Sequence, residues 1–471
     1  MKAKDTSTLK VPSKSKRIGI FAGLCWLYTC IHLDRQILAI LAESIKSDMK
    51  ISDPALGALT GSAFSIVYAL LGLYFGRVAD AADRLAMVRI GALVWSLASV
   101  GAAFAPGYPW LIAARSGVAA GEAIATAAAV SLMAELAGDR YRARASSLFS
   151  ACAFLGAGLA AIVGGVVINH FAHSTSIVGW RAAMVAAGLP GIAGALYLSF
   201  YRWGDTLDRA PLRTAGFASV TAVLLAASVL AVAVQMRWPP NLSVPAAVLL
   251  AVAAATYWSY RLKVDDSAAY HSTLGQASFR WLLLGFAAVL FIDFAASFWL
   301  IAFAQRKFGL SAAQTGTHLG GLMIVGGIAG SAAGGWIADR WHKKSPAGRV
   351  WTALIASLVE AVMILVAVVQ PHYLGFILAF AGFCLSSGGW TGVAAAIGMD
   401  MIPRAHRGTG VAAYFLVTTI LGPGLGAFTA GLLADSLNSV GNSLSLCCGT
   451  IVIALAAFIR LGRTLAAAAR P

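Results

Sequence analysis

The sequence predicts an all-α membrane protein that crosses the bilayer fourteen times. Hydrophobic residues make up 59% of the 471-residue chain and charged residues 11%, with a mean hydropathy of +0.79, which is more apolar surface than a water-soluble fold of this size needs. Apolar stretches of about 20 residues, the length that a helix needs to cross the hydrocarbon core, recur along the whole chain. Basic residues gather in alternate turns, as the orientation rule for membrane helices requires.

Six spans are expected in each half of the chain, with two more between the halves. The first six are 18–42, 55–79, 86–104, 109–134, 145–170 and 181–201. The two central spans are about 214–235 and 243–260. The last six are 281–304, 312–338, 350–369, 373–399, 408–434 and 443–461. We therefore expect a basic tail at 1–17, a first six-helix bundle at 18–202, a linker carrying the two extra helices at 203–280, a second bundle at 281–462 and a tail at 463–471.

The two bundles are related by an internal repeat with an offset of 259 residues. This offset matches Gly57 with Gly316, Gly61 with Gly320, Gly76 with Gly335, Ala79 with Ala338 and Asp80 with Asp339. Extended without a gap, it also matches Asp34 of the first span with Asp293 of the first span of the second half. The repeat predicts two pseudo-symmetric bundles with an inserted hairpin, and a substrate site between them near mid-membrane.

The net charge of +16 is explained by membrane orientation rather than by a nucleic-acid partner. With the amino terminus inside, 27 of the 35 Lys and Arg residues lie at the inner face. This distribution predicts a multi-pass protein of the cell inner membrane with both termini in the cytoplasm. The six cysteines lie in apolar spans without metal-ligand spacing, so we expect packing roles, no metal and no cofactor.

A few ionisable residues lie well inside the spans, where each charge costs about 2.5–3.5 kcal/mol on insertion scales. They are Asp34, Arg35, Arg115, Glu122, Asp293 and Glu360. Arg115 and Glu122 are two helical turns apart on one face, with their heads about 10 Å apart along the axis. The adjacent pair Asp34 and Arg35 points in directions about 100° apart, so one can face a cavity while the other reaches a neighbouring helix.

This cluster has the composition of a proton-coupling site. Desolvation favours the neutral acid and a nearby guanidinium favours the carboxylate, so a modest conformational change can move Asp34 across the working pH. Protonation of Asp34 would free an arginine for an anionic substrate group. The alternative is a static ion network that only fixes helix packing. Asp293 is a further proton-coupling candidate because it occupies the repeat position of Asp34, although it lacks an obvious partner in the sequence. Glu360 is more readily explained as a protonated, hydrogen-bonded group.

Two glycine-containing turns, 76–84 and 334–344, end the second helix of each bundle at the inner face. Their candidate inner-gate residues are Gly76, Asp80, Arg84, Gly335, Asp339 and Arg340, whose ion pairs would latch the bundles together. Pro423 is a candidate hinge. Aromatic side chains that could line the substrate cavity include Tyr68, Trp390 and Tyr414.

These turns resemble the loop signature of the major facilitator superfamily, although Ala81 and Asp83 depart from it in the first copy. The segments LDRQI (33–37) and RSGVAAGEA (115–123) resemble the Spinster subfamily, and the resemblance covers both bundles. It implies a major facilitator fold, lipid-like substrates such as lysophospholipids, and proton coupling. It also implies that Asp34 is the protonation site, that Arg35 and Arg115 are its electrostatic partners, and that Glu122 is a second protonatable group. His32 and the extra hairpin are departures from the animal members.

The leading hypothesis is a monomeric, proton-coupled secondary transporter of an amphiphilic or anionic organic solute, such as a lysolipid or organic acid. A multidrug/proton antiporter is the second transporter hypothesis. A ligand receptor on the same scaffold is the alternative from another class. Sequence motifs of intramembrane enzymes and of ATP-binding loops are missing, so we expect no enzyme activity and a gradient as the source of energy.

Overall fold

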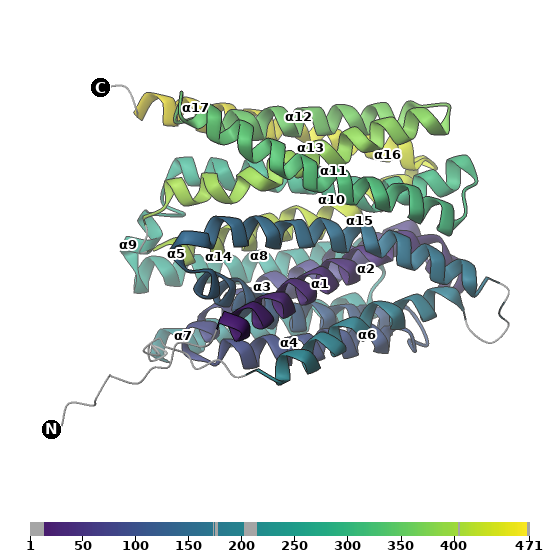
Figure 1. The fold of residues 1–471 in the computed structure, drawn as a ribbon, viewed down its shortest axis with the longest axis horizontal. Coiled ribbons are helices and arrows are strands. Elements are labelled where there is room, and N and C mark those ends of the chain that lie inside the picture. The colour runs from purple at the N-terminus through teal and green to yellow at the C-terminus, as the bar shows by residue number, and fades with distance from the viewer. Residues whose placement is uncertain (1–13, 173, 175–177, 202–213, 404–405, 469–471) are drawn as a thin grey trace.

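The computed structural model describes residues 14–172, 174, 178–201, 214–403 and 406–468, and every regular element in these ranges is a helix. The long helices run side by side along the long axis of the molecule (Figure 1). Helix α1 begins and α17 ends at one end of the molecule, which we call the terminal end. The turns that follow α1 and α10 lie at the other end, which we call the far end.

The described residues up to 271 form nine helices, which belong to the first bundle, the hairpin and the linker after it. They are α1 (Lys14–Met49), α2 (Asp53–Thr60), α3 (Ser62–Ala81), α4 (Arg84–Ala102), α5 (Tyr108–His170), α6 (Gly179–Ser199), α7 (Thr214–Arg237), α8 (Pro240–Asp265) and α9 (Ser267–His271). Within α5, the segments Tyr108–Met133 and Leu148–His170 each have the length and composition of a membrane span. They correspond to the expected spans 109–134 and 145–170.

The described residues from 277 onward form eight α-helices and a short 3₁₀ turn of the second bundle. They are α10 (Ala277–Phe308), α11 (Ala312–His342), α12 (Gly348–Val369), α13 (Tyr373–Met401), α14 (Arg407–Leu421), α15 (Pro423–Leu437), α16 (Val440–Cys447), η2 (Cys448–Thr450) and α17 (Ile451–Ala468). The described residues thus contain fourteen segments long and apolar enough to cross a membrane. The prediction of an all-α protein with fourteen spans is confirmed.

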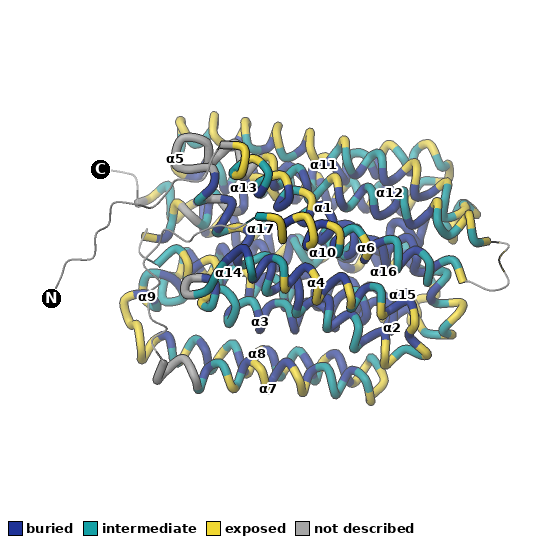
Figure 2. Tube along the Cα trace, turned by 60° about the horizontal axis from the view of Figure 1, so that its bottom comes forward, coloured by how far each residue is buried: buried dark blue, intermediate teal, exposed yellow. Residues whose placement is uncertain are grey.

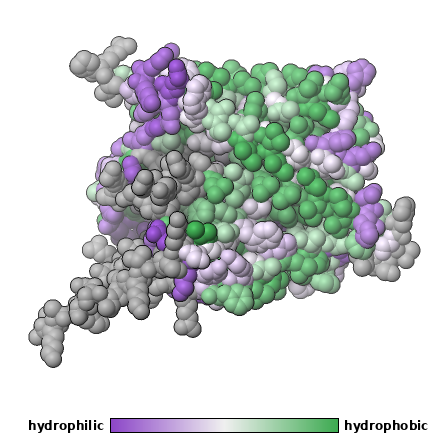
Figure 3. All heavy atoms as spheres, viewed as in Figure 1, coloured by the Kyte–Doolittle hydropathy of each residue, from purple (hydrophilic) through white to green (hydrophobic). Residues whose placement is uncertain are grey.

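The surface has the polarity that a bilayer requires. Apolar residues cover the middle of the molecule, and hydrophilic residues gather at its two ends (Figure 3). Many large apolar residues are exposed. Exposed residues, yellow in Figure 2, recur along the outer helices. Because lipid tails take the place of water around such a protein, exposed apolar side chains in this band do not indicate a missing partner.

Two membrane spans that were expected to be continuous are interrupted at a glycine within the described residues, one in each bundle. A third, 443–461, is divided by the 3₁₀ turn η2. The expected helix 55–79 is interrupted at Gly61, which separates α2 from α3, and the expected helix 408–434 is interrupted at Gly422, which separates α14 from α15. The breaks lie against each other, because a Cβ atom on Gly61 would be 2.8 Å from the carbonyl oxygen of Pro423. This close approach of backbones explains why a glycine occupies the first break.

The hairpin α7–α8 lies along the seam between the bundles. The two helices pack on each other along one edge of the molecule (Figure 2), α7 contacts α3 and α5, and α8 contacts α2, α3, α14 and α15. Val244 of α8 is fully buried with Ala58 of α2 and Phe428 of α15. Next to the first break, the Ser62 hydroxyl donates a 2.7 Å hydrogen bond to Oε1 of Gln235 in α7. The hairpin therefore touches both bundles. The domain boundaries at 17, 202, 280 and 462 stay a prediction.

Candidate functional site

Asp34 is a fully buried acid of the cluster expected from the sequence. It lies on α1 with no solvent exposure, and its Oδ2 accepts a 2.9 Å hydrogen bond from Nη1 of Arg115 on α5. Its other oxygen accepts from the hydroxyl of Ser99 on α4. The Arg115 guanidinium also donates to the backbone carbonyls of Asp34 and Arg35, at 3.4 Å each. One acid thus ties three helices of the first bundle together.

Arg35 and Glu122 form a second ion pair between α1 and α5. The Nε atom of Arg35 donates to Oε2 of Glu122 at 2.5 Å, and Glu122 is fully buried whereas the Arg35 side chain is 23% exposed. The Arg35 guanidinium lies 4.6 Å from the ring centroid of Tyr68 and 4.8 Å from that of Phe64. The Arg115 guanidinium is 4.8 Å from the same Phe64 ring. The two aromatic rings stack on each other, so they form a cation–π platform beneath both arginines.

The cluster contains two acids and two arginines, but its hydrogen bonding is incomplete. Oε1 of Glu122 and Nε of Arg115 are buried without a hydrogen-bond partner among the described residues. An unsatisfied buried polar atom is costly in a packing network. These two atoms are therefore free to accept or donate new bonds when a proton or a ligand enters.

The candidates in the second bundle lie in a different group. Asp293 on α10 accepts a 2.6 Å hydrogen bond from the hydroxyl of Ser387 on α13. Trp390 donates its indole N–H to Oε2 of Glu360 at 2.6 Å and is almost fully buried. Tyr414 is partly buried against Phe286. Asp34 and Asp293, which the repeat matches, thus lie on the first helix of each bundle. Their partners differ, because Asp34 binds an arginine and Asp293 binds a serine.

The inner-gate candidates lie at the terminal end, and their described ion pairs stay within one bundle. Arg84 donates to the carbonyl of Ala79 and to Glu135 of the first bundle, whereas Arg349 pairs with Asp339 at 2.8 Å in the second. A Cβ atom on Gly76 or on Gly335 would meet nothing within 4 Å, and Arg340 lies over the ring of Trp336. The side chain of Asp80 lies outside the described residues. The latch between bundles stays a prediction.

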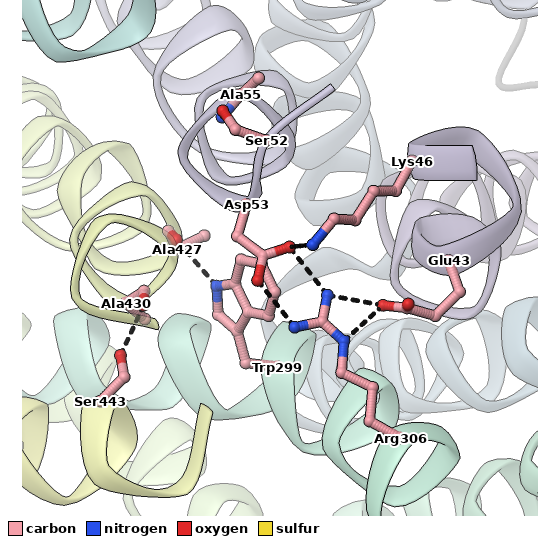
Figure 4. A network of polar contacts seen from close by, with 10 residues as sticks. All are labelled: Glu43, Lys46, Ser52, Asp53, Ala55, Trp299, Arg306, Ala427, Ala430 and Ser443. Carbon is pink, nitrogen blue, oxygen red and sulfur yellow. Dashed lines mark hydrogen bonds and ion pairs between the residues drawn. The ribbon is translucent and has the colours of Figure 1, made fainter. Parts of the chain in front are cut away.

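A site that sequence reasoning missed joins the bundles at the far end (Figure 4). Arg306 of α10 donates to Glu43 of α1 at 2.8 Å and to both carboxylate oxygens of Asp53, at 2.7 and 2.8 Å. Lys46 completes the group with a 2.6 Å ion pair to Asp53. We call these four residues the far-end cluster. Its members are ordinary charged residues near helix ends, so the sequence carries no signal for their pairing.

The far-end cluster also borders a cavity of about 750 Å³ that opens at this end. Beside it the bundles approach closely, because a Cβ atom on Gly57 would be 2.4 Å from the carbonyl oxygen of Ala427, and one on Gly431 would be 2.4 Å from that of Asp53. Contacts between the bundles at the far end are therefore both ionic and backbone to backbone.

Two six-helix bundles with buried charges on facing helices define the class of secondary membrane transporters. The Major Facilitator Superfamily profile matches residues 24–427. The chain is 26% identical over 411 residues to an MFS-type efflux pump of Mycolicibacterium smegmatis, covering 87% of this chain and 82% of that protein. It is also 26% identical over 435 residues to human protein spinster homolog 1, covering 89% and 73% of the two chains.

Solved structures show the same fold. A bacterial homolog of the human lysosomal transporter Spinster, in an inward-facing and unoccupied conformation, aligns with a TM-score of 0.73 at 21% identity over 96% of this chain and 98% of the other. A peptide transporter in complex with sulfate also aligns with a TM-score of 0.73, at 16% identity over 98% and 100% of the chains. The chain belongs to the Major Facilitator Superfamily, and Spinster proteins are among the transporters to which it is similar.

Proposed function

We propose that this transporter is proton-coupled, works by alternating access, and moves an amphiphilic or anionic organic solute. The observation that carries the proposal is the pair of buried acid–arginine contacts between α1 and α5, Asp34 with Arg115 and Arg35 with Glu122. Four ionisable groups on two helices exceed what packing requires in an apolar bundle, where charges are retained for ion and substrate pathways.

Asp34 is the proton switch in this proposal. In the structure it is paired and accepts hydrogen bonds from two side chains, Ser99 and Arg115. Protonation removes the negative charge that holds Arg115, whose Nε is already without a partner. Arg115 can then bind another acid, either Glu122 on its own helix or an anionic group of the substrate.

Arg35 is the substrate-binding arginine in this proposal. It is the exposed member of the cluster, and the rings of Phe64 and Tyr68 lie beside its guanidinium. A cationic head next to aromatic faces suits a ligand with an anionic group and an apolar body. A niacin transporter of Acinetobacter baylyi, 32% identical over 36% of this chain, and the spinster homologs are among the relatives and fit a small organic or lipid-like cargo.

The same proposal places the protein in a cell inner membrane with the terminal end in the cytoplasm. The basic residues of the turns at that end support this orientation. The far-end cluster then closes the outer side, while the ion pairs of the inner turns remain within their own bundles. In alternating access, the far-end contacts open as the inner turns approach each other.

Substrate-driven proton movement in liposomes tests the coupling. The cargo is first chosen from organic acids and lysophospholipids by the rise in unfolding temperature that each produces. A pH-sensitive dye inside the liposomes then reports proton flux on addition of that compound. We expect Asp34→Asn to abolish flux. Asp48→Asn should retain it, because Asp48 also lies on α1 but pairs with Arg181 of α6 outside the cluster. Unchanged flux in Asp34→Asn would rule out Asp34 as the coupling residue.

Multidrug/proton antiport is the second candidate, and the similarity to the mycobacterial efflux pump favours it. An antiporter for cations uses buried acids but does not need two arginines. Competition by several chemically unrelated organic cations for transport of one of them would support this function over transport of an anion.

A further inference from the structure

Asp293 and Glu360 form a carboxyl pair inside the second bundle. Asp293 lies on α10 and Glu360 on α12, and they are 8% and 1% exposed. Each accepts one neutral hydrogen bond at 2.6 Å, Asp293 from Ser387 and Glu360 from Trp390, and these two donors lie one turn apart on α13, so the two acids converge on the same part of that helix. The sequence offered these acids separately and gave no reason to pair them.

The described residues provide no cation for this pair. Neither carboxyl group takes part in any of the ion pairs found in the described part of the chain. The titratable groups that face the pair are the buried thiols of Cys384 on α13 and Cys448 of η2. This environment differs from that of the α1–α5 cluster, where a guanidinium lies against each acid.

Two carboxylates cannot both remain ionised close together inside an apolar bundle without a positive charge. A carboxylate oxygen only accepts hydrogen bonds, and Oε1 of Glu360 is buried without a donor among the described residues, so a proton bound to the carboxyl group would stabilise it. We propose that Asp293 and Glu360 form a proton-binding site in the second bundle that holds one shared proton. The site titrates as a pair, so the proton belongs to both residues.

In this proposal, the bound proton lies in the second bundle and not in the first. Two acids and two arginines balance each other in the α1–α5 cluster, so in this conformation that cluster needs no proton. The second bundle carries an acid pair whose charge is balanced only by a bound proton. Release of this proton requires the two carboxyl groups to separate or a cation to enter between them. The role of this step in transport rests on the proposed function, whereas the occupancy of the site does not.

Infrared spectroscopy of the full chain in liposomes tests the site without substrate or transport. A protonated carboxyl group has a carbonyl stretch apart from that of carboxylates, and this band shifts on exchange into D₂O. We expect the band at neutral pH in the natural protein and its loss in the double variant Asp293→Asn/Glu360→Gln. The matched double variant Asp34→Asn/Glu122→Gln removes two buried acids from the other bundle and should keep it.

A band that persists at full intensity in Asp293→Asn/Glu360→Gln overturns the proposal, as does a band lost from Asp34→Asn/Glu122→Gln instead. If the double variant does not fold, the single variants Asp293→Asn and Glu360→Gln replace it. Each should shift the band, because an amide cannot share the proton, and an unshifted band in both contradicts the site. Stabilisation by sodium chloride but not by choline chloride, with no band in the natural protein, would assign the pair to a metal cation and overturn a proton site. Failure of proton-coupled transport leaves these outcomes unaffected.

Discussion

Arg115 connects the two members of the α1 charge pair. Its guanidinium donates to the Asp34 carboxylate and to the backbone carbonyls of Asp34 and Arg35, and it lies over the Phe64 ring. A single side chain thus fixes the backbone of α1 at the point where its charges lie. Loss of the Asp34 charge changes the position of this side chain first.

Arg115→Leu should therefore destabilise the protein by about 3 kcal/mol, because it leaves the fully buried Asp34 carboxylate without its cation. Addition of Asp34→Asn to this variant should recover most of the loss, since the remaining neutral amide needs no counter-charge. Thermal unfolding of the two single variants and the double variant in detergent gives the coupling energy. Additive losses would show that the two residues do not interact energetically.

The charged members of the cluster could be predicted from the sequence, whereas their pairing could not. Asp34, Arg35, Arg115 and Glu122 are recognisable because charges inside apolar spans are costly. The partner of each depends on how α1 and α5 rotate against each other. Ser99 resembles any other membrane serine in the sequence, so its bond to Asp34 has no sequence signal. The convergence of Asp293 and Glu360 likewise depends on how α10 and α12 pack against α13, which supplies a hydrogen-bond donor to each.

At the scale of the elements, the main departure from expectation is the break at Gly61. Glycines are frequent in membrane helices, and Gly72 lies in the same expected span as Gly61. The sequence alone therefore could not show that the helix breaks at Gly61 and not at Gly72. The break becomes intelligible only with the backbone of α15 in place. The expected hinge at Pro423 does coincide with a helix start, because α15 begins there after Gly422.

Gly57→Ala should shift the protein toward a form that is open at the far end. The new methyl group would lie 2.4 Å from the carbonyl oxygen of Ala427, so α2 and α15 must separate at a cost of about 1–3 kcal/mol. Spin labels at Asn169 and Asn442, in a cysteine-free background, report the distance between the bundles. Gly72→Ala adds the same methyl group where nothing lies within 4 Å and should not change the distance. A similar distance distribution in both variants would contradict the close contact.

Gln235→Leu tests whether the hairpin stabilises the first break. The substitution removes the acceptor of the 2.7 Å hydrogen bond from Ser62, which should lower stability by about 1 kcal/mol. Ser228→Ala is the matched control on α7, because that hydroxyl bonds only to the carbonyl of Leu224 in its own helix. Unfolding temperatures of the two variants should therefore differ. Equal temperatures would mean that the hairpin contact contributes nothing to the fold.

The whole molecule is held together at the far end by charges from both bundles. The Arg306 guanidinium of the second bundle binds Glu43 of the first bundle and makes a bidentate interaction with Asp53 of the same bundle. A bidentate ion pair is stronger than a simple surface pair. The fold itself was predictable at this scale, because span length, charge distribution and the repeat are properties of the entire chain. Which end is closed depends on contacts between particular side chains, such as that of Arg306 with Asp53, and the sequence patterns do not reveal these contacts.

Arg306→Gln should raise the population that is open at the far end by about fivefold, equivalent to roughly 1 kcal/mol for partly exposed ion pairs. The same spin labels at Asn169 and Asn442 measure this population. Arg181→Gln removes an arginine of similar exposure whose ion pair with Asp48 lies within the first bundle, and it should have no effect on the population. An equal response of the two variants would show that the far-end cluster does not hold the bundles together.

Because the hairpin covers only one of the two seams between the bundles, the two seams differ in their exposure to lipid. One seam between the bundles, formed by α2 and α3 with α14 and α15, is covered by α8, whereas α5 and α11 meet at the other. A cargo that partitions into the bilayer would therefore reach the protein by sideways diffusion from one flank only. For such a cargo, the hairpin α7–α8 would block lateral entry from the bilayer at the seam that it covers. The position of the hairpin would therefore determine the side from which the cargo enters.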